Sequence, residues 1–497
     1  MPVTPNSEAY ENEILIEPTG FREYDARWRF PEQINLRGMQ ALGMSIGTML
    51  HESGQSPDIV AGHDYRSYSA YIKHALIIGL MTAGCRVHDI GLALSPVAYF
   101  AQFDLGCPAV AMVTASHNEN GWTGVKMGVN RPLTFGPGEM SQLKEMALQK
   151  TYKSREGGRY IHIANMRSRY LVDLAKGGPL KRKLKVVVAC GNGTAGIYAP
   201  VALEMIGCEV VPMDCKLDYN FPRHNPNPED MAMLHALRDK VLESGADIGF
   251  AFDGDGDRCG VVDNTGEEIF ADKMGVLLAR DLSAQHGGGR FVADVKSTSL
   301  YKNDAILAKN GAKTDYWITG HSYIKRRVNE LNALAGFEKS GHFFFNSPVG
   351  RGYDDGVLSA IMICRMMDRH ETMTLADVRK TLPRTWSSPS MSPDCPDEAK
   401  YAIVDRVIGH YREKMKNGEK IMNQKISEIM TVNGARIVLE DGTWGLVRAS
   451  SNKPCLVVVV ESPVSETGMK GMFRELDGTL SSFKEIGAYD QKIDLAA

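Results

Sequence analysis

The sequence predicts an α/β protein built of three successive α/β units, followed by a smaller α+β unit. Short apolar runs alternate with longer stretches of helical pattern, which is typical of parallel sheets covered by helices. The 49 glycines among 497 residues match the many tight turns of such folds. At about 150 residues per domain, this length predicts three or four domains.

The first unit contains two predicted helices and three predicted strands. These are a helix at 36–52, a strand starting at 58–61, a helix ending near Ala83, and strands at 86–90 and 108–113. The last strand is a short apolar run with two valines, which indicates a buried position. Upstream, Tyr24 and Arg27 lie in an arginine-rich segment that either clamps an anion or, more simply, leads into the first helix.

A serine follows the last of these strands. The segment Thr114–Gly121 offers the Ser116 hydroxyl at a strand end, beside His117 and the backbone donors of a turn that contains glycine. Such a position suits a nucleophile or a phosphate group. Taken alone, the segment is better interpreted as an ordinary surface turn, and the rest of the chain changes that balance.

The second unit begins after a charged connection at 151–183 that is predicted to contain one helix. A strand at 184–190 leads into Gly191–Gly196, and a helical stretch and a second strand follow at 209–213. The G-x-G-x-x-G spacing between strand and helix fits a dinucleotide-binding turn. Any tight turn of this kind also favours glycine, so dinucleotide binding is a minor alternative.

The sharpest motif lies between strands predicted at 246–252 and 259–263. Its loop alternates aspartates with glycines, and side chains at alternate positions converge on one hard cation such as Mg²⁺. An EF-hand is excluded because Arg258 stands at the sixth position, Asn264 stands at the twelfth, and the flanks are strands. The predicted metal ligands are Asp253, Asp255 and Asp257.

The third unit carries polar loops beside its predicted strands. Lys296 follows one strand, His321 opens a helix, and the loop Gly336–His342 precedes an aromatic strand. The glutamate, serine and histidine of that loop suit sugar hydroxyls, although an ordinary polar loop has the same composition. Tyr353–Gly356 is predicted to begin another helix.

The fourth unit follows a hinge-like segment at 386–397 that is rich in proline and serine. Its predicted elements are a helix at 398–415 and strands at 435–439, 444–448 and 455–461. Between the last two strands, the turn at 448–454 combines arginine, hydroxyls, an amide and lysine. These groups suit a phosphate, and a polar hairpin accounts for the turn equally well.

Composition argues against several classes of protein. The formal net charge of −3 gives no electrostatic basis for binding nucleic acid or an anionic membrane. The nine cysteines lack C-x-x-C spacing, which favours reduced thiols over disulfides or a zinc site. The N-terminal segment lacks a signal-peptide pattern, and no apolar run approaches the length of a membrane span. A cytoplasmic location is expected.

Four loops match one family pattern in order: the turn at 114–121, the loop at 253–258, the loop at 336–342 and the turn at 448–454. With Phe21–Asp25, they make nearly the whole chain resemble the α-D-phosphohexomutase superfamily, and within it the bacterial phosphomannomutase/phosphoglucomutase group. The resemblance implies three α/β domains with mixed sheets and a smaller α+β domain around a central cleft. The implied ranges, carrying the phosphoserine, metal, sugar and phosphate loops in turn, are 1–156, 157–269, 270–385 and 386–497.

The resemblance also implies roles for individual residues. Ser116 is expected to carry the phosphoryl group and to contact Mg²⁺ together with the three aspartates. The other expected catalytic residues are His117, Lys126, Arg258 and Arg27. The expected substrate-binding residues are Tyr24, Lys296, His321, Glu338, Ser340, His342, Arg448, Ser450 and Asn452.

The sequence departs from the family pattern in three segments. Glu119–Thr123 replaces a segment that commonly contains proline and tyrosine, and Ala26–Trp28 stands where Ile-Arg-Gly is usual. The last turn reads Ser450–Lys453 where Ser-Asn-Thr is usual, which leaves the register of Asn452 open. None of these changes removes a charged catalytic group.

The implied activity is the interconversion of hexose 6-phosphate and hexose 1-phosphate, with mannose or glucose or both as the sugar. A phosphoserine enzyme and a hexose 1,6-bisphosphate intermediate are implied, with Mg²⁺ and Lys126 stabilising the transferring phosphoryl group. The expected partners are small phosphosugars, without nucleic acid or membrane, and the protein is expected to be a monomer or dimer.

Two alternatives to this activity stay open. The first is phosphoglucosamine mutase, whose sugar loop usually carries glutamine where this chain has Lys339. The second is a dinucleotide-dependent oxidoreductase built on Gly191–Gly196, against which the triple-aspartate loop argues because hydride transfer does not need it.

Overall fold

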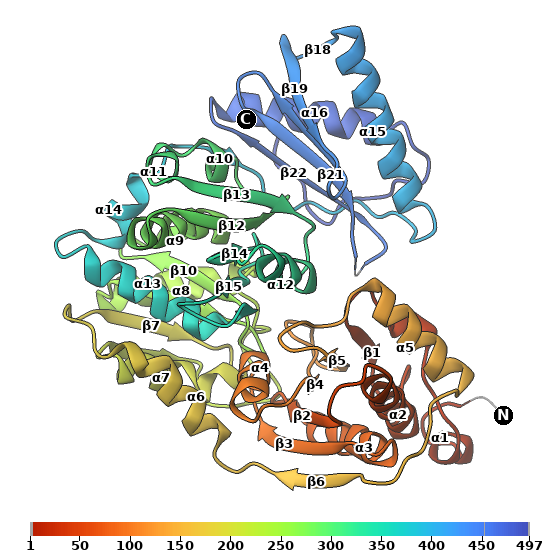
Figure 1. Cartoon of the computed structure of the whole chain (residues 1–497). Coiled ribbons are helices and arrows are strands. Elements are labelled where there is room, and N and C mark those ends of the chain that lie inside the picture. The colour runs from red at the N-terminus through yellow and green to blue at the C-terminus, as the bar shows by residue number, and fades with distance from the viewer. Residues whose placement is uncertain (1–2, 452, 496–497) are drawn as a thin grey trace.

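The computed structural model describes residues 3–451 and 453–495 and has four domains around one cleft (Figure 1). Three domains carry a mixed sheet covered by helices, and the C-terminal domain carries an antiparallel sheet. The predicted fold class is therefore confirmed. The four predicted residue ranges stay predictions.

Domain I comprises α1 (Glu8–Asn12), β1 (Ala26–Arg29), α2 (Leu36–Glu52), β2 (Asp58–His63), α3 (Ser69–Thr82), β3 (Arg86–Leu92), α4 (Ser95–Asp104), β4 (Ala109–Val113), β5 (Trp122–Gly128), α5 (Pro137–Gln149) and β6 (Arg159–His162). The sheet order is β1-β5-β4-β2-β3-β6, antiparallel at β1 and β5 and parallel elsewhere. Asn35 begins α2 by accepting a hydrogen bond from the Gly38 amide at 2.8 Å. Gly43 lets α2 approach α3, since a Cβ there would lie 2.3 Å from the Leu76 carbonyl oxygen.

Domain II comprises α6 (Met166–Leu174), β7 (Lys185–Ala189), the 3₁₀ turn η3 (Thr194–Ile197), α7 (Ala199–Met205), β8 (Glu209–Met213), α8 (Met231–Ser244), β9 (Ile248–Phe252), β10 (Cys259–Asp263) and β11 (Glu268–Ile269). Its sheet runs β11-β10-β9-β7-β8, with parallel pairing only among β9, β7 and β8. The aspartate loop is thus the turn of the β9–β10 hairpin.

Domain III comprises α9 (Ala271–His286), β12 (Gly289–Asp294), α10 (Leu300–Asn303), α11 (Ala305–Lys309), β13 (Ala312–Trp317), α12 (His321–Glu330), β14 (Ala335–Phe337), β15 (Phe343–Phe345), β16 (Tyr353–Asp354), α13 (Gly356–Arg369) and α14 (Leu375–Lys380). Its sheet order is β13-β12-β14-β15-β16.

Domain IV comprises β17 (Trp386–Ser387), α15 (Lys400–Asn417), β18 (Lys420–Ile421), β19 (Gln424–Met430), β20 (Ala435–Leu439), β21 (Trp444–Ala449), β22 (Leu456–Ser462) and α16 (Glu466–Leu480).

Three short strands differ from the sequence-based expectations. The connection at 151–183 contains β6, which pairs in parallel with β3 and so extends the first sheet beyond residue 156. The segment 386–397 begins with β17, which pairs with β22 of domain IV. Tyr353–Asp354 is a strand rather than the start of a helix, because it pairs with Phe344–Phe345.

The apolar cores show how the domains are joined. One continuous cluster of buried side chains runs from Val60 in domain I through Phe250 in domain II to Phe337 in domain III. Domain IV has a separate core between its sheet and its two helices, with Phe473 at its centre. A small apolar cluster around Val295 and Trp444 continues from domain III into domain IV, and Met430 of domain IV packs against the larger cluster. Domains I to III therefore form one packed body to which domain IV is attached.

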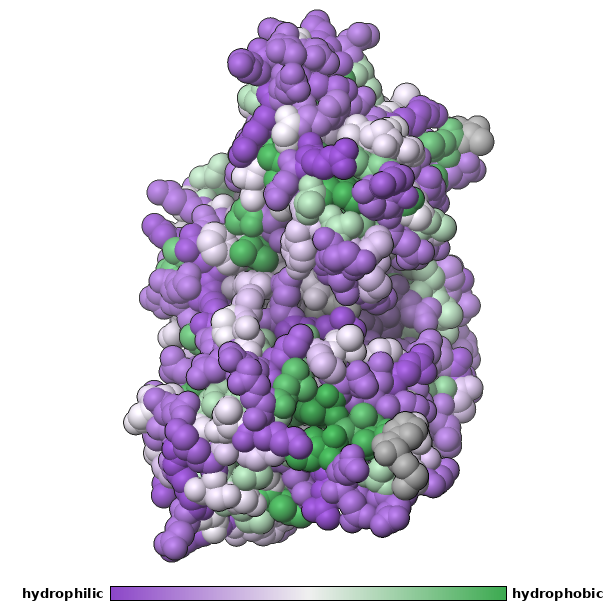
Figure 2. Space-filling model, turned by 90° about the vertical axis from the view of Figure 1, so that its right-hand side faces the viewer, coloured by the Kyte–Doolittle hydropathy of each residue, from purple (hydrophilic) through white to green (hydrophobic). Residues whose placement is uncertain are grey.

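The cleft opens on the face shown in Figure 2, which is hollowed between domain IV at the top and domain I at the bottom. Hydrophilic residues dominate around this hollow. None of the helices in the described part of the chain has both the length and the apolar character needed to cross a bilayer.

A buried glutamate holds domain IV against domain III. The Glu461 carboxylate lies 2.6 Å from the Lys273 ammonium and accepts hydrogen bonds from the Ser299 amide at 2.9 Å and the Trp444 indole at 3.0 Å. Burial alone would raise the pKa of Glu461, but Lys273 outweighs it and the pKa is lowered. The carboxylate is thus ionised and paired across the domain boundary.

We expect Glu461→Ala to lower the free energy of unfolding by about 3–5 kcal/mol, because the Lys273 ammonium is left without its counter-charge. Glu428→Ala is the matched control, since Glu428 is half exposed and faces Lys302 at 3.8 Å. The control should cost about 0–1 kcal/mol. Chemical denaturation measures both, and equal losses in the two variants would contradict the role of Glu461 at this junction.

Candidate active site

The serine turn lies at the carboxyl end of β4 and has a strained backbone. Ser116 has φ +53°, a left-handed conformation that costs a non-glycine residue free energy. Its side chain is buried, and its amide donates to the Thr114 hydroxyl at 2.8 Å. Residues held in such conformations are concentrated at functional sites, where the surrounding structure stabilises them.

A buried ion pair stabilises this turn. The Thr114 hydroxyl donates to Asp64 at 2.8 Å, and Asp64 pairs with Arg66. The Arg66 guanidinium in turn donates to the carbonyl oxygens of Ser116 at 3.0 Å and of Asn118 at 2.7 Å. Arg66 therefore fixes the backbone on both sides of His117, a role for which the sequence carries no local signal.

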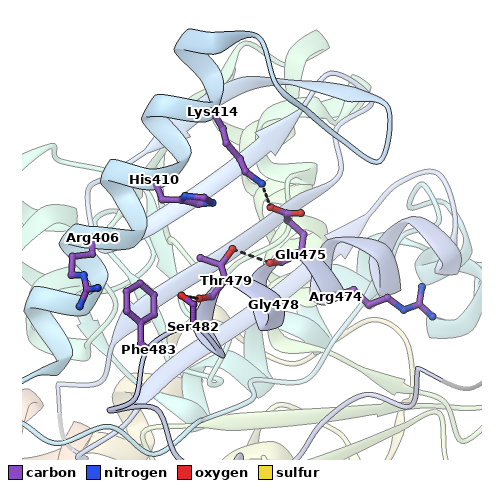
Figure 3. Close-up of a pocket in the computed structure, with 9 residues that line it drawn as sticks. All are labelled: Arg406, His410, Lys414, Arg474, Glu475, Gly478, Thr479, Ser482 and Phe483. Carbon is purple, nitrogen blue, oxygen red and sulfur yellow. Dashed lines mark hydrogen bonds and ion pairs between the residues drawn. The ribbon is translucent and has the colours of Figure 1, made fainter.

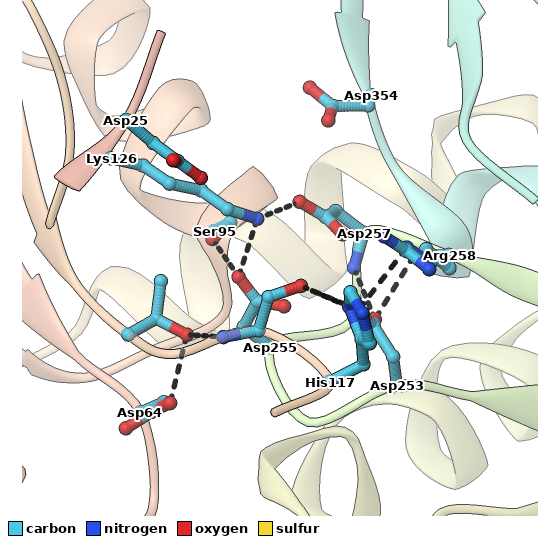
Figure 4. A network of polar contacts seen from close by, with 12 residues as sticks. Asp25, Asp64, Ser95, His117, Lys126, Asp253, Asp255, Asp257, Arg258 and Asp354 are labelled. Carbon is cyan, nitrogen blue, oxygen red and sulfur yellow. Dashed lines mark hydrogen bonds and ion pairs between the residues drawn. The ribbon is translucent and has the colours of Figure 1, made fainter. Parts of the chain in front are cut away.

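The aspartate loop brings three fully buried carboxylates together (Figure 4). One Asp253 oxygen accepts the amides of Asp257 at 3.1 Å and Arg258 at 3.2 Å, which closes the hairpin turn around it. The other Asp253 oxygen lies 3.3 Å from the Ser116 hydroxyl. The serine turn of domain I thus faces the loop of domain II.

Lys126 joins the same two domains. Its ammonium, on β5 of domain I, lies 2.7 Å from Asp255 and also contacts Asp257 (Figure 4). The Ser95 hydroxyl at the start of α4 donates to Asp255 at 2.5 Å. Domain I therefore supplies both a cation and a hydroxyl donor to the carboxylates of domain II.

Burial and mutual repulsion shift the pKa values of these groups. Burial, followed by the neighbouring carboxylates, raises the pKa of Asp253 well above its usual value, and the pKa of Asp257 is also raised by burial and by Asp255. Burial also acts to raise the pKa of Asp255, but the Lys126 ammonium outweighs this effect and the pKa is lowered. Burial, Arg258 and Arg27 hold the pKa of His117 well below its usual value, so this imidazole is neutral.

The three carboxylates fit a hard divalent cation. An oxygen from each lies within 4.8 Å of the others, and one oxygen each of Asp255 and Asp257 has no hydrogen-bond partner although it is buried. Buried carboxylate oxygens without a donor are costly, and a cation bound by oxygens satisfies them. The donor set is therefore suited to a metal of the Mg²⁺ type.

Domain III places a second set of polar groups opposite the first. Glu338 is buried and accepts the Gly320 amide at 2.6 Å, and burial raises the pKa of its carboxyl group. His321, at the start of α12, packs edge-on against Tyr24 of domain I, with ring centroids 4.8 Å apart. Lys296 lies 3.8 Å from Asp294 at the end of β12.

Arg258 connects the aspartate loop to domain III. Its guanidinium lies 2.8 Å from Glu229, and its Nε–H donates to His342 Nε2 at 3.0 Å. Arg27 of domain I is held by Asp25 at 2.8 Å. Two arginines from different domains therefore have fixed orientations beside Ser116.

Domain IV contributes Arg448 at the end of β21. The guanidinium donates to the Ala449 carbonyl at 2.8 Å and to Asn433 at 3.3 Å, and the side chain is largely buried. Ser450 is also buried, and its hydroxyl accepts the Lys453 amide at 3.2 Å. Asn452 lies outside the described residues.

A cavity of about 150 Å³ joins these groups. Predicted residues that line it are Tyr24, Arg27, Ser116, Lys126, Arg258, Lys296, His321, Glu338, Ser340, His342 and Arg448. The three aspartates, His117 and Ser450 do not line it, although the aspartates and His117 contact residues that do. Glu229, Thr319 and Gly320 also line the cavity, and sequence reasoning missed them.

A larger cavity of about 560 Å³ lies elsewhere, between α15 and α16 of domain IV (Figure 3). Arg406, His410 and Lys414 line one side of it, and Glu475 pairs with Lys414 at 2.6 Å. It contains none of the predicted site residues. Size alone therefore does not identify the site in this molecule.

The glycine turn at 191–196 is packed against protein rather than open to a ligand. A Cβ at Gly191 would lie 2.9 Å from Pro226, and one at Gly193 would lie 3.3 Å from Gly254. The turn leads into the short η3 segment, and the Thr194 amide donates to the Gly254 carbonyl at 3.3 Å. These contacts support the aspartate loop and leave no room for a pyrophosphate.

Fold and site together define a four-domain α/β enzyme with a phosphoryl-transfer type of centre: a serine beside an acidic cation site in a cleft rich in arginine and lysine. The family models agree in order along the chain. Phosphoglucomutase/phosphomannomutase α/β/α domains I, II and III match residues 18–154, 168–266 and 270–386, and the C-terminal domain of that family matches 394–478. The chain belongs to the phosphoglucomutase/phosphomannomutase family, within the α-D-phosphohexomutase superfamily.

Individual relatives have different names. A phosphomannomutase/phosphoglucomutase of Pseudomonas putida is 34% identical over 442 residues, which cover 89% of this chain and 91% of the relative. A probable phosphoglucosamine mutase of Methanothermobacter thermautotrophicus is 27% identical, with 90% and 95% covered. A crystal structure of a phosphoglucomutase/phosphomannomutase family protein from Burkholderia thailandensis has a TM-score of 0.83 at 27% identity, covering 94% of this chain and 98% of that one.

We expect the affinity for Mg²⁺ to rise with pH. The raised pKa values of Asp253 and Asp257 mean that protons compete with the cation, so deprotonation strengthens binding as pH increases through those pKa values. Isothermal titration with Mg²⁺ at a series of pH values measures this. An affinity that is independent of pH would contradict the carboxylate assignment.

Asp255→Asn should weaken Mg²⁺ binding by about 10-fold or more, because the site loses an anionic oxygen ligand. Asp239→Asn is the control, since Asp239 lies exposed on α8 of the same domain and contacts only the neighbouring Arg238 in the described contacts. Binding to the control should equal that of the wild type. Equal binding to both variants would place the cation elsewhere.

Proposed function

We propose that this phosphohexomutase interconverts the 6-phosphates and 1-phosphates of mannose, glucose or both. Ser116 carries the phosphoryl group, and hexose 1,6-bisphosphate is the intermediate and activator. The observation that carries this proposal is the Ser116 hydroxyl, which lies 3.3 Å from Asp253 within a site where Lys126 contacts the two other aspartates.

Phosphoryl transfer from Ser116 breaks the serine O–P bond and forms an O–P bond to a sugar hydroxyl, and the proton lost by that hydroxyl ends on the serine oxygen. Asp253, Asp255 and Asp257 would hold Mg²⁺, which supplies positive charge to the phosphoryl oxygens when it is bound. Lys126 and Arg258 add cations that are held beside the aspartates, by Asp255 and by His342 respectively. Because both domains bury these groups, water has little access to a phosphoserine.

The opposite wall of the cleft suits a sugar phosphate. Glu338 and Ser340 present acceptor and donor groups for adjacent hydroxyls, and Arg448 provides a guanidinium for the phosphate that does not react. A bisphosphate must expose each end in turn to Ser116, so the distal site must accept either phosphate. A grip on the 3- and 4-hydroxyls is compatible with glucose and mannose, which differ at C2.

Kinetics on three substrates test the assignment. We expect coupled assays to give kcat/KM values for glucose 1-phosphate and mannose 1-phosphate within about 10-fold of each other. Glucosamine 1-phosphate should be a poorer substrate by at least that factor. Preference for glucosamine 1-phosphate would favour a phosphoglucosamine mutase, and inactivity with every hexose phosphate would contradict the proposal.

Ser116→Ala should lose at least about 1000-fold in kcat, because the phosphoryl acceptor is absent while the surrounding donors remain. The intact mass of the wild type should show one phosphate after incubation with glucose 1,6-bisphosphate, and that of the variant should show none. Ser451→Ala, in the turn at 448–454, is the control. Its intact mass should still show one phosphate, because Ser116 is unchanged. A phosphate on the Ser116→Ala protein would refute the assignment of the nucleophile.

A further inference from the structure

Behind the wall of the cleft lies an ion pair that the proposed reaction does not use. Asp354 and Lys325 have no exposed side-chain surface, and their carboxylate oxygen and ammonium lie 3.0 Å apart. The ammonium also sits 3.7 Å from the centre of the Tyr99 ring of domain I. Burying a charged pair costs free energy that its attraction does not always recover, so a pair at this position is expected to serve a function.

The second Asp354 oxygen faces a histidine of the cleft. His342 Nδ1 lies 3.1 Å from Asp354 Oδ2, and His342 Nε2 accepts the Nε–H of Arg258 at 3.0 Å. A guanidinium donates hydrogen bonds and never accepts them, so Nε2 carries no proton. The proton of a neutral His342 ring therefore sits on Nδ1, which lies 3.1 Å from Asp354 Oδ2 and 3.5 Å from Asp257 Oδ1.

The backbone fixes this line of three side chains. Asp354 on β16 pairs with Phe344 on β15, so its position relative to His342 is set by strand register. The other side is fixed by a bridge between Arg258 and His342, in which the Cys259 amide donates to the Gly341 carbonyl at 3.0 Å.

We propose that Asp354 is a positioning residue of the active site, which, opposite the Arg258 donor, orients the Nδ1–H tautomer of His342 and, through His342, the Arg258 guanidinium. Asp354 does not line the cavity, whereas His342 and Arg258 do. Lys325 keeps the carboxylate ionised by supplying its counter-charge. The predicted effect of Asp354 on kcat rests on the proposed function. The predicted tautomer of His342 does not depend on it.

A second metal site at the same place is the competing interpretation. One ligand atom each from Asp257, His342 and Asp354 lies within 4.8 Å of the others. A metal on His342 Nδ1 would require that atom to lose its proton while Nε2 is still occupied by the Arg258 donor, which leaves an imidazolate. The Lys325 ammonium beside Asp354 also repels a cation. The geometry thus favours a contact between the Asp354 carboxylate and the Nδ1 side of His342 over a metal site.

The fold offers a matched control one residue along. Asp355 is as buried as Asp354, but it caps α13 by accepting the Leu358 amide at 2.9 Å, and it accepts the Tyr170 hydroxyl at 2.9 Å. Its carboxylate has no contact with His342 or Arg258 among the described interactions. Substitution of Asp355 therefore shows how much stability and activity are lost when a buried carboxylate next to Asp354 is removed without a change at His342.

Asp354→Asn should lower kcat by about 10- to 100-fold and leave KM for the hexose phosphate within about twofold, since the ring orientation changes and the substrate contacts remain. Asp355→Asn should lower the melting temperature and leave kcat unchanged. A kcat of Asp354→Asn equal to that of the wild type would overturn the proposal, as would equal losses of kcat in both variants.

A spectroscopic measurement determines the tautomer of His342 without any catalytic turnover. Multiple-bond ¹H–¹⁵N spectra of the full-length protein, with labelled histidine and a His342→Gln variant for assignment, distinguish the two tautomers. The wild type should show the Nδ1–H form at His342, and Asp354→Asn should keep that form but shift its ring ¹⁵N signals, because a neutral amide replaces the carboxylate beside Nδ1. An Nε2–H form in the wild type would overturn the proposal even if Asp354→Asn does not fold. Because no substrate is present, failure of the proposed function leaves this result interpretable.

Discussion

The contact of Lys126 with Asp255 and Asp257 is the interaction on which the site depends. It places a buried lysine of the first domain against the acidic loop of the second. Three buried carboxylates repel one another when ionised, so the Lys126 ammonium of domain I stabilises the loop. The same docking brings the strained Ser116 turn against Asp253. Domain assembly and assembly of the reactive centre are therefore one event.

Domain IV is attached to the rest of the protein in a different way from the other three domains. Domains I to III share an apolar core, whereas domain IV has its own core and is held by Glu461 and by a small apolar cluster. Across the cleft, Tyr401 of α15 donates to Glu23 of domain I at 2.5 Å, beside Tyr24. Loops of domains I and II thus hold the proposed reacting groups, and Arg448, the proposed ligand of the second phosphate, belongs to domain IV. Such an arrangement suits an intermediate that must turn around in the cleft.

The sequence predicts those features that lie within one short segment. The aspartate loop is recognisable because aspartates at alternate positions between two apolar strands repel one another unless they share a cation. The strand before Ser116 is recognisable from its apolar run. The short strands β6 and β17 are not, because strands of four and two residues depend on a partner strand for their existence.

The supporting residues of the site escape prediction for a related reason. Arg66, Ser95, Glu229 and Asp354 each act on a residue that is distant in the sequence. Their hydrogen-bond partners become neighbours only through the sheet topology and the docking of domains. No local pattern of residue types therefore distinguishes these side chains from ordinary polar ones.

The serine turn and the aspartate loop hold one cation between them if the site works as proposed. Mn²⁺ in place of Mg²⁺ makes this measurable, since electron–nuclear double resonance detects a phosphorus nucleus within a few ångströms of the manganese. The phosphorylated wild type should show ³¹P coupling to the bound Mn²⁺, and the Ser116→Ala protein treated in the same way should not. Tight Mn²⁺ binding to the phosphorylated enzyme without any ³¹P coupling would contradict a cation shared by Ser116 and the three aspartates.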